Sequence, residues 1–351
     1  MSRDGDEDAI FAYRNSILHA ETNFKARVAA NDCPSTDVKS YEILTRAAAG
    51  KYNIIYKARK DGKICVIRQQ LKKPLGETSM IDPTRIVQEK KFLYAMNSKF
   101  IVRIFAKDKD EMFVYTIMEY TPWGDLRRYL KNRAQPEALA VKMIGQVVLA
   151  LEYIHACNII YRDLKPDNIL IFPGGRLKIT DFKRACLGKY CGDKFGANCL
   201  YAPPEIINQA LYTCAADWWA CGILLYLILL NSHPFVTTEI ERKAIFDRVL
   251  KKRLQVPEGD AISAEAKDLI KALLVKDHTK RLGSEKFGVD IVKRQDWFKD
   301  LDFMALISAD EIFPLNPRRN HESREEPASA DVFQNTKPDS FDEERELFKE
   351  F

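Results

Sequence analysis

The sequence predicts a two-part α+β protein, with a small antiparallel sheet in its N-terminal half and a helical C-terminal half. Between Tyr41 and Met118, short apolar runs rich in β-branched and aromatic residues indicate strands, and one helical pattern interrupts them. After Gly124 the apolar residues recur at helical spacing instead. The chain has 351 residues and is 46% hydrophobic, which is enough to bury a core in both parts.

We expect four segments: an N-terminal helix and linker (1–40), the sheet part (41–120), the helical part (121–300) and a C-terminal tail (301–351). Residues 9–30 carry apolar positions at helical spacing and predict one helix, which Asn31–Ser35 ends. The last forty or so residues are rich in charge and contain Pro314, Pro317, Pro327 and Pro338, so we expect them to be extended.

In the sheet part we expect strands within Tyr41–Ile43, Ile54–Tyr56 and Ile64–Ile67, a helix at 83–96, and strands at Ile101–Phe105 and Met112–Met118. The pair Asp61-Gly62 favours a tight hairpin turn between the second and third strands. Pro83 falls in the first helical turn, where its missing N–H costs nothing.

In the helical part the periodic pattern predicts helices at 137–156, 215–230 and 264–275. The apolar run Trp218–Leu230 is about thirteen residues long, well short of the roughly 20 that a membrane span needs. We therefore expect this run to be a buried helix.

Composition and charge narrow the function. The net charge of +5 is mild, so we expect neither nucleic-acid nor membrane binding. The eight cysteines form no Cys-x-x-Cys pair, so neither a zinc site nor a disulfide framework is indicated, and free thiols fit a reducing interior. The acidic N-terminus lacks the apolar core of a signal peptide, and residue 2 is Ser2 instead of the glycine that myristoylation needs. We expect a cytoplasmic or nucleocytoplasmic protein without a membrane anchor.

The most informative stretch runs from Tyr161 to Asn168 and is followed by Asp181-Phe182. The string resembles the catalytic loop of eukaryotic protein kinases, and this resemblance implies that Asp163 would accept the proton of a substrate hydroxyl and that Lys165 would neutralise charge on the transferring phosphoryl group. Asn168 and Asp181 offer the hard oxygen ligands that magnesium binds. A charged loop that only solvates a turn would explain a single Asp-x-x-x-x-Asn, but not the whole string in this order.

These residues resemble the catalytic loop and metal-binding aspartate of eukaryotic protein kinases. Within that family the chain resembles the catalytic subunit of cAMP-dependent protein kinase, in the group of tailed basophilic Ser/Thr kinases. The features that carry this resemblance are Tyr161, Asp217–Trp219, Asp277–Gly283 and the terminal Phe348–Phe351. The resemblance covers nearly the whole chain. It implies the bilobal kinase fold, ATP and Mg²⁺ as cofactors, a protein substrate, and a cAMP-responsive regulatory subunit as a candidate partner.

The resemblance also implies roles for residues outside the motif. Glu89 matches the helix glutamate that pairs with the ATP-anchoring basic residue, and Met118 matches the residue behind the adenine. The hinge from Glu119 to Thr121 would bind the base through its backbone, and Leu170 would lie below the base. Three further residues match structural positions, namely the ion-pair partners Glu205 and Arg281 and the loop-holding Asp217.

The chain departs from the family around the nucleotide. Arg68 stands at the position of the anchoring lysine, and its planar fork is longer and shaped differently from an ammonium. Val66 replaces an alanine and narrows the adenine pocket. The glycine-rich loop reads Ala48–Asn53 and keeps only Gly50, although glycine there lets backbone N–H groups approach the phosphates. The residues we expect to border the nucleotide in this part are Ala47, Ala48, Gly50, Lys51, Tyr52, Asn53, Ile55, Val66 and Arg68.

A further departure follows the metal-binding aspartate, where Lys183 replaces a glycine. Lys183 could hinder magnesium, could supply the charge that the anchoring lysine no longer gives, or could be solvated without a role. The segment from Asp181 to Glu205 contains no serine or threonine, and Lys194 stands at the position of the activating phosphothreonine. Arg162 therefore has no phosphate to bind there, and Asp193 could offer it a carboxylate instead.

The substrate-binding positions have changed as well. Asp125 and Asp167 keep the carboxylates that read arginines in substrates of the family. Leu200 and Leu227 replace two recognition glutamates, and leucine cannot pair with a guanidinium. We expect no strong preference for an arginine two residues before the acceptor.

Two functions remain open. The intact set Asp163, Lys165, Asn168 and Asp181 favours a Ser/Thr protein kinase of reduced or altered activity, in which Arg68 and Glu89 complete the catalytic residues. The departures around the nucleotide favour a pseudokinase that acts as a partner-binding scaffold or decoy. A kinase of small molecules is disfavoured, because the resemblance is to protein kinases throughout.

Overall fold

The computed structural model describes residues 3–49, 53–72, 83–130, 133–192, 199–236, 241–257, 259, 261–284, 288–314 and 326–327. The chain forms two compact units. Unit 1 comprises Met1–Thr22, Ser98–Phe100 and Trp123–Leu315, and unit 2 comprises Asn23–Asn97, Ile101–Pro122 and Asn316–Phe351. Among the predicted site residues, Gly50, Lys51, Tyr52, Asp193 and Lys194 lie outside the described part of the chain.

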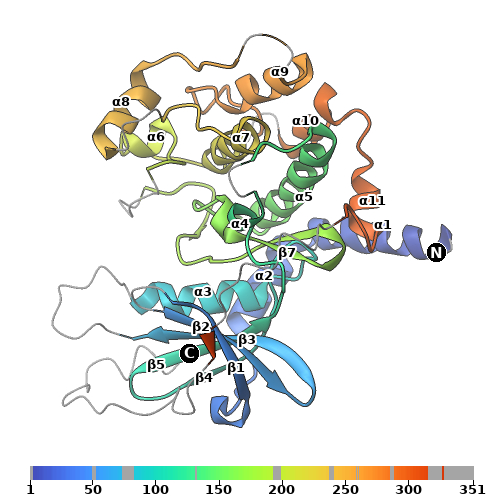
Figure 1. The fold of residues 1–351 in the computed structure, drawn as a ribbon, viewed down its shortest axis with the longest axis vertical. Helices are drawn as coiled ribbons and strands as arrows, with labels where there is room; N and C mark the ends of the chain where they lie inside the picture. Colours follow the sequence, from blue (N-terminus) through green and yellow to red (C-terminus); the bar gives the residue numbers. More distant parts are fainter. Residues whose placement is uncertain are drawn as a thin grey trace. The chain divides into compact units, whose positions relative to one another are not determined.

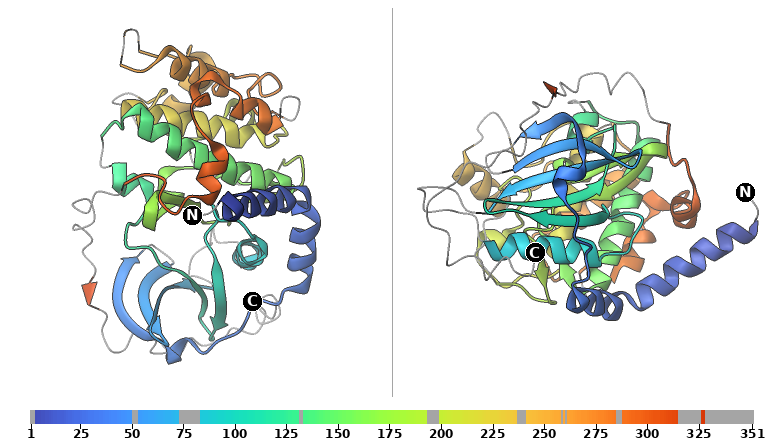
Figure 2. Two further views of the ribbon diagram at one scale, coloured as in Figure 1. Left: turned by 90° about the vertical axis from the view of Figure 1, so that its right-hand side faces the viewer. Right: turned by 90° about the horizontal axis from the view of Figure 1, so that it is seen from below.

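Unit 2 is built on an antiparallel sheet (Figures 1 and 2). Its described strands lie in the order β10-β1-β2-β3-β5-β4. Their bounds are β1 Glu42–Ala49, β2 Asn53–Lys60, β3 Lys63–Leu71, β4 Ile104–Lys109, β5 Phe113–Glu119 and β10 Glu326–Pro327. Asp61 and Gly62 have φ angles of 50° and 75°, so β2 and β3 are joined by the tight left-handed turn that the sequence predicts.

Apolar side chains of the sheet form the core of unit 2. The buried cluster consists of Val38, Tyr56, Ala58, Cys65, Ile67, Ala106, Tyr115 and Ile117. The helix α3 (Pro83–Ala95) runs along one face of the sheet (Figures 1 and 2). Because α3 carries the buried Glu89 toward β3, this packing sets up one part of the predicted nucleotide site.

The strand predicted at Ile101–Phe105 is wrong in its start, because β4 begins only at Ile104 and continues to Lys109. Ile101 and Val102 are buried at 2% and 1% exposure without belonging to the strand. Both residues are apolar because they pack in the core, and a short apolar run that packs without forming a strand cannot be told from a strand by sequence alone.

The single helix predicted at 9–30 is also wrong, because the structure has two helices, α1 (Arg3–Leu18) and α2 (Ala20–Ala30). The break at His19 lies just before the chain passes from unit 1 to unit 2 after Thr22. Within unit 2, Phe24 of α2 packs edge-to-face on Phe92 of α3, with ring centroids 5.4 Å apart.

Unit 1 is helical, and its centre is the pair α5 (Glu137–Ala156) and α7 (Ala215–Leu230), which pack side by side (Figure 1). The helix α5 is long and apolar enough to cross a membrane by composition, but 67% of that stretch is buried inside the protein, as in the core of a globular domain. The other described helices are α4 Leu126–Leu130, α6 Pro204–Ile207, α8 Arg242–Lys251, α9 Ala264–Leu273, α10 Gly288–Lys293 and α11 Phe303–Ser308.

Short strand pairs frame the predicted catalytic loop. The strand β6 (Ile159–Ile160) pairs with β9 (Cys186–Leu187), and β7 (Ile169–Phe172) pairs with β8 (Arg176–Ile179). The loop from Tyr161 to Asn168 therefore has a strand at each end, and its position is fixed by both pairs.

The segment expected as the C-terminal tail begins with the helix α11, which the sequence analysis did not predict, whereas most of the last forty or so residues, expected to be extended, lie outside the described part of the chain. Asp302 caps this helix, because its carboxylate accepts hydrogen bonds from the backbone N–H groups of Met304 and Ala305. An aspartate directly before an apolar run is a signal for the start of a helix, and the high charge of the surrounding segment obscured it here. Farther along the tail, β10 extends the sheet of unit 2 by pairing with β1.

Candidate active site

A buried carboxylate holds the catalytic loop in place. Asp217, in the first turn of α7, is fully buried and accepts the backbone N–H groups of Tyr161 at 2.9 Å and Arg162 at 2.7 Å. The same carboxylate lies 2.8 Å from Nε2 of His155. Arg162 has a φ of 68°, a conformation that is costly for a non-glycine residue. The bonds to Asp217 maintain that conformation and thereby the direction of the next residue, Asp163.

Asp163 is 2% exposed and lies within reach of two polar side chains. Nζ of Lys165 is 2.8 Å from Oδ2 of Asp163, and Nδ2 of Asn168 donates to the same oxygen at 2.8 Å. Burial raises the pKa of Asp163, and the charge of Lys165 partly offsets that rise. The other oxygen, Oδ1, is buried and has no hydrogen-bond partner among the described residues. This arrangement leaves one carboxylate oxygen available to take a proton.

Asp181 presents a second carboxylate in this unit, with a φ of 60°. Its Oδ1 is also buried without a hydrogen-bond partner in the part of the chain that the structure describes. Its Oδ2 lies 2.7 Å from Nζ of Lys183. Arg184 approaches the neighbouring Asp163, with Nε 3.7 Å from Oδ2. The predicted base and the predicted metal-binding carboxylate therefore each have a cation from the segment after Phe182 beside them.

The residues fit a magnesium ion that is shared with a nucleotide. Oδ1 of Asp181 and the amide oxygen of Asn168 are hard ligands, while the amide nitrogen of Asn168 is used on Asp163. Within the described residues, no cluster of three or more His, Cys, Asp or Glu side chains could hold a metal by itself. Phosphate oxygens and water would have to complete the coordination, which is the usual way that proteins bind Mg²⁺ with a nucleotide.

Unit 2 carries the predicted nucleotide residues of the sheet. Nη1 of Arg68 on β3 lies 2.7 Å from Oε1 of Glu89, and both side chains are buried. The structure thus brings these two residues together as expected, while their role toward ATP stays a prediction. Val66 pairs directly with Met118 across β3 and β5, so the added methyl groups of Val66 lie beside the residue predicted behind the adenine.

The remaining predicted nucleotide residues are placed as follows. Ala48 pairs with Ile55 in the β1–β2 hairpin, where Ala47 and Ala48 are exposed and Asn53 and Ile55 are half-buried. Glu119 ends β5, and its carboxylate accepts the backbone N–H of Arg103 at 2.7 Å, while Thr121 follows in a half-buried position. Leu170 belongs to unit 1, where it is half-buried on β7 and forms an isolated antiparallel β-bridge with the backbone of Asp125.

Arg162 has partners that the sequence did not suggest. It donates from Nε to the carbonyl oxygen of Arg184 and from Nη1 to the hydroxyl of Tyr212, and Nη1 lies 3.3 Å from Sγ of Cys191. Cys191 and Tyr212 are joined by a backbone bridge, which places both at the guanidinium. The prediction that Asp193 serves Arg162 remains untested. No local pattern identifies Tyr212 as a partner, because the two residues are 50 positions apart.

The predicted substrate carboxylates also have neighbours that the sequence analysis missed. Nε of Arg127 lies 2.6 Å from Oδ1 of Asp167, and Nη2 donates to the hydroxyl of Tyr201 at 3.3 Å. Asp125 accepts the backbone N–H of Arg128 at 2.8 Å, and burial raises the pKa of Asp125. The only sequence signal for Arg127 is its place two residues after Asp125.

Comparison with known proteins decides the family. The sequence profile of the protein kinase domain matches residues 41–298, which include both units' predicted site residues. The chain belongs to the protein kinase family.

Within this family the kinase groups with cAMP-dependent catalytic subunits. It is 32% identical over 295 residues to "cAMP-dependent protein kinase catalytic subunit 3" of Drosophila melanogaster, covering 80% of this chain and 48% of that protein. It is 34% identical over 258 residues to "cAMP-dependent protein kinase catalytic subunit PRKX" of Homo sapiens, covering 70% of each. "cAMP-dependent protein kinase type 3" of Saccharomyces cerevisiae is 29% identical over 286 residues, which is 80% of this chain and 70% of the yeast protein. The kinase thus spans about half of the fly relative's length and about two thirds of the others'.

The ion pair that the resemblance implied in the helical part of the kinase is present. Arg281 lies 2.6 Å and 2.9 Å from the two carboxylate oxygens of Glu205, in a bidentate arrangement. Arg281 also donates to the carbonyl oxygen of Ala215 at 2.8 Å. Because both side chains are buried, removing either one would leave an uncompensated charge, so we assign the pair to stability.

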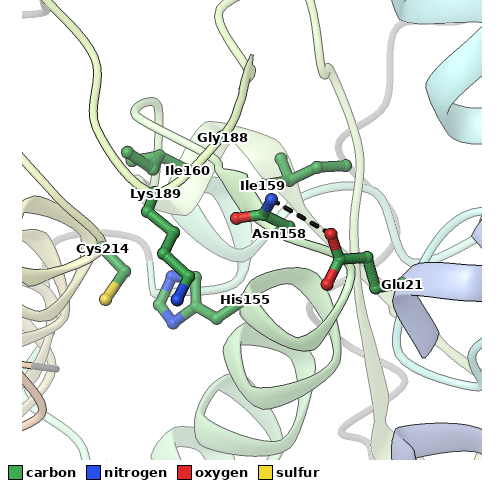
Figure 3. Close-up of a pocket in the computed structure, with 8 residues that line it drawn as sticks. All are labelled: Glu21, His155, Asn158, Ile159, Ile160, Gly188, Lys189 and Cys214. Carbon is green, nitrogen blue, oxygen red and sulfur yellow. Dashed lines mark hydrogen bonds between the residues drawn. The ribbon is translucent and has the colours of Figure 1, made fainter. Parts of the chain in front are cut away.

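Unit 1 of the kinase also contains a cavity of about 450 Å³, lined in part by the strand β6 that leads into the catalytic loop (Figure 3). Its lining residues are Glu21, His155, Asn158, Ile159, Ile160, Gly188, Lys189 and Cys214. In this lining, Nδ2 of Asn158 donates to Glu21 at 3.2 Å. His155 also binds Asp217, so the cavity wall and the support of the catalytic loop share a residue.

Proposed function

We propose that this kinase transfers the γ-phosphate of ATP to serine or threonine hydroxyls of proteins, at a reduced rate. One observation carries the proposal: Asp163 is held by Lys165 and Asn168 and keeps a buried carboxylate oxygen without a partner among the described residues. A base that must take a proton from a bound hydroxyl needs such a free and oriented oxygen. Membership in the kinase family supports the same reaction.

The residues divide the work as follows. Oδ1 of Asp163 accepts the hydroxyl proton of the substrate, and Lys165, which is 2.8 Å from Asp163, places positive charge where the transferring group develops negative charge. Asp181 and Asn168 would hold magnesium, which neutralises phosphate charge when bound. Arg68, fixed by Glu89, would contact the phosphates from unit 2.

The reduced rate follows from Arg68. Its buried Nη1 is committed to Glu89, and a planar guanidinium cannot reproduce the position of a lysine ammonium. A misplacement of about 1 Å in such a group can cost roughly a hundredfold in rate. We also propose, on the names of the relatives alone, a cAMP-responsive regulatory subunit as a partner and a cytoplasmic or nucleocytoplasmic location.

The test is to incubate the full chain with ATP, Mg²⁺ and a proteome-derived peptide mixture, and to locate new phosphate groups by mass spectrometry. We expect phosphoserine and phosphothreonine that are absent when the chain is omitted. Phosphate only on tyrosine, or none above the blank, would contradict the proposal.

A pseudokinase is the second candidate, and a specific contact favours it. Lys183 lies 2.7 Å from Oδ2 of Asp181, so an ammonium competes with magnesium for that carboxylate. On this alternative the chain binds a partner or a nucleotide without transferring phosphate. Thermal shift with ATP in the presence and absence of Mg²⁺ distinguishes the two, because a kinase needs metal-dependent binding, whereas stabilisation unchanged by a chelator favours the pseudokinase.

A further inference from the structure

The predicted substrate region contains an internal guanidinium. Arg127, on the short helix α4, lies 2.6 Å through Nε from Oδ1 of Asp167. A second bond, from Nη2 to the hydroxyl of Tyr201 at 3.3 Å, fixes the other side of the fork. A carboxylate that recognises a substrate arginine accepts the same kind of hydrogen bond, from Nε or Nη of the arginine to a carboxylate oxygen.

The position of Asp167 makes the contact relevant to substrates. Asp167 lies in the turn Pro166–Asn168, directly after Lys165 on the loop that carries the base Asp163. A peptide that delivers a hydroxyl to Asp163 advances about 3.3 Å per residue, so its neighbouring residues pass this turn. Asp167 and Arg127 are 42% and 48% exposed, so both can meet a peptide.

The carboxylate of Asp167 is neutralised within the chain. Asp167 is paired with the guanidinium of Arg127, whereas Asp125 accepts the backbone N–H of Arg128, a contact that carries no countercharge. Leu200 adds no charge, and its carbonyl oxygen accepts a hydrogen bond from His233 Nε2 at 2.6 Å. The next residue, Tyr201, packs its ring against His233 at a centroid distance of 6.4 Å. Next to the neutralised Asp167, the buried Tyr201 and the half-buried Leu200 therefore add apolar side chains and no carboxylate.

We infer that Arg127 takes the place of a substrate arginine, because it binds Asp167, the carboxylate on which such an arginine would otherwise bind. The site therefore takes acceptor segments that have an apolar residue at the second position before the hydroxyl. The inference rests on the proposed function and names its substrate class. Arg127 acts on specificity by neutralising Asp167, and the half-buried Leu200, next to Tyr201, offers an apolar side chain there.

Peptide binding tests the inference separately from catalysis. Two fluorescent peptides carry alanine in place of the acceptor, one with arginine at the second and third positions before it, the other with leucine and alanine there. Anisotropy titrations use the full chain in three forms: native, Arg127→Ala, and Arg128→Ala as the control of equal charge on the same helix.

The native chain should bind the leucine peptide at least as tightly as the arginine peptide. Arg127→Ala should tighten binding of the arginine peptide by about tenfold, the effect of one charge-assisted contact, with little change for the leucine peptide. The double variant Arg127→Ala/Asp167→Ala should lose this gain.

Three results would overturn the inference: a native chain that prefers the arginine peptide tenfold, equal gains from Arg127→Ala and Arg128→Ala, or no binding of the arginine peptide to Arg127→Ala. The corresponding serine peptides then report on phosphotransfer. Gain of arginine binding without any transfer would support the role of Arg127 and count against the proposed function alone.

Discussion

At the scale of single residues, the main feature is that cations of the chain itself lie beside the carboxylates that phosphotransfer needs. Lys183 lies 2.7 Å from Asp181, and Arg127 lies 2.6 Å from Asp167. The string from Asp163 to Asn168 keeps the residues expected of a kinase catalytic loop, so we expect the departures to affect ligand binding more than the chemistry.

Replacing Lys183 by methionine should lower the Mg²⁺ concentration needed for ATP binding by about threefold to fivefold. The pair with Asp181 is partly exposed, and such pairs contribute about 1 kcal/mol or less. Isothermal titration of ATP at several Mg²⁺ concentrations measures the change, with Lys189→Met, an exposed lysine of the same segment, as the control. Weaker ATP binding in Lys183→Met would instead show that the ammonium supplies charge to the phosphates.

Arg68→Lys should raise kcat/KM for phosphotransfer by about tenfold, which corresponds to about 1.4 kcal/mol of transition-state stabilisation. Lysine offers a compact ammonium that can bind Glu89 and a phosphate together, whereas the guanidinium is committed to Glu89 at 2.7 Å. Initial rates with ATP and Mg²⁺ measure the effect, and Arg59→Lys provides a matched control, because the side chain of Arg59 on β2 is exposed. A rate that falls or stays the same would mean that the site has adapted to arginine.

At the scale of elements, a buried lysine in α3 gives unit 2 a pH-dependent stability. Lys90 is fully buried, its Nζ donates to Oδ1 of Asn31 at 3.0 Å, and Lys107 and Cys33 lie beside it. Burial, together with the charge of Lys107, lowers the pKa of Lys90 to about 7. In the unfolded chain the lysine titrates near pH 10.4, so between these values the unfolded state binds more protons than the folded state.

The free energy of unfolding should therefore rise with pH from about 7 toward 10, by at most about 1.4 kcal/mol per pH unit from this group. Below pH 7 the residue is protonated in both states, and the folded protein bears the full cost of the buried charge. Lys90→Met should remove this slope and stabilise the protein at pH 7. Urea unfolding at pH 7 and 9 measures it, with Lys91→Met as the control. Equal slopes in native and Lys90→Met chains would contradict the assignment.

The sequence predicted elements best where one local rule determines them. The turn at Asp61-Gly62 needs left-handed backbone, and the helix at 215–230 is apolar throughout, so both agree with the structure. The break between α1 and α2 and the late start of β4 depend on tertiary packing, which apolar spacing does not record. The helix α11 was missed because its Asp302 cap lies inside a charged tail.

At the scale of the whole molecule, some parts of the candidate site follow from a local sequence motif, and others depend on contacts between distant residues. The residues of the catalytic loop follow from a short string, because the loop brings Asp163, Lys165 and Asn168 together locally. The partners Arg127–Asp167 and Arg162–Tyr212 join residues 40 and 50 positions apart, and no motif links them. The grouping of Asp163, Lys165 and Asn168 was therefore predictable from the sequence, whereas the contacts of Arg127 and Arg162 required the structure.

The two units carry different parts of the predicted site. Unit 1 contains the proposed base Asp163 with the predicted metal ligands, and unit 2 contains the pair Arg68–Glu89 and the predicted hinge from Glu119. Phosphotransfer with Asp163 as the base depends first on the string Asp163–Asn168 of unit 1, which keeps the residues expected of a kinase.

The most direct test compares the initial rate of label transfer from γ-labelled ATP to a protein substrate for the native chain and Asp163→Asn. The substitution keeps the size of the side chain but replaces the basic carboxylate with a neutral amide, which cannot take up the proton. General-base catalysis contributes roughly 10²–10⁴-fold to the rate. If Asp163 is the base, the initial rate should fall by at least about 100-fold in Asp163→Asn, with little change in ATP binding. A native rate no higher than that of Asp163→Asn would contradict it.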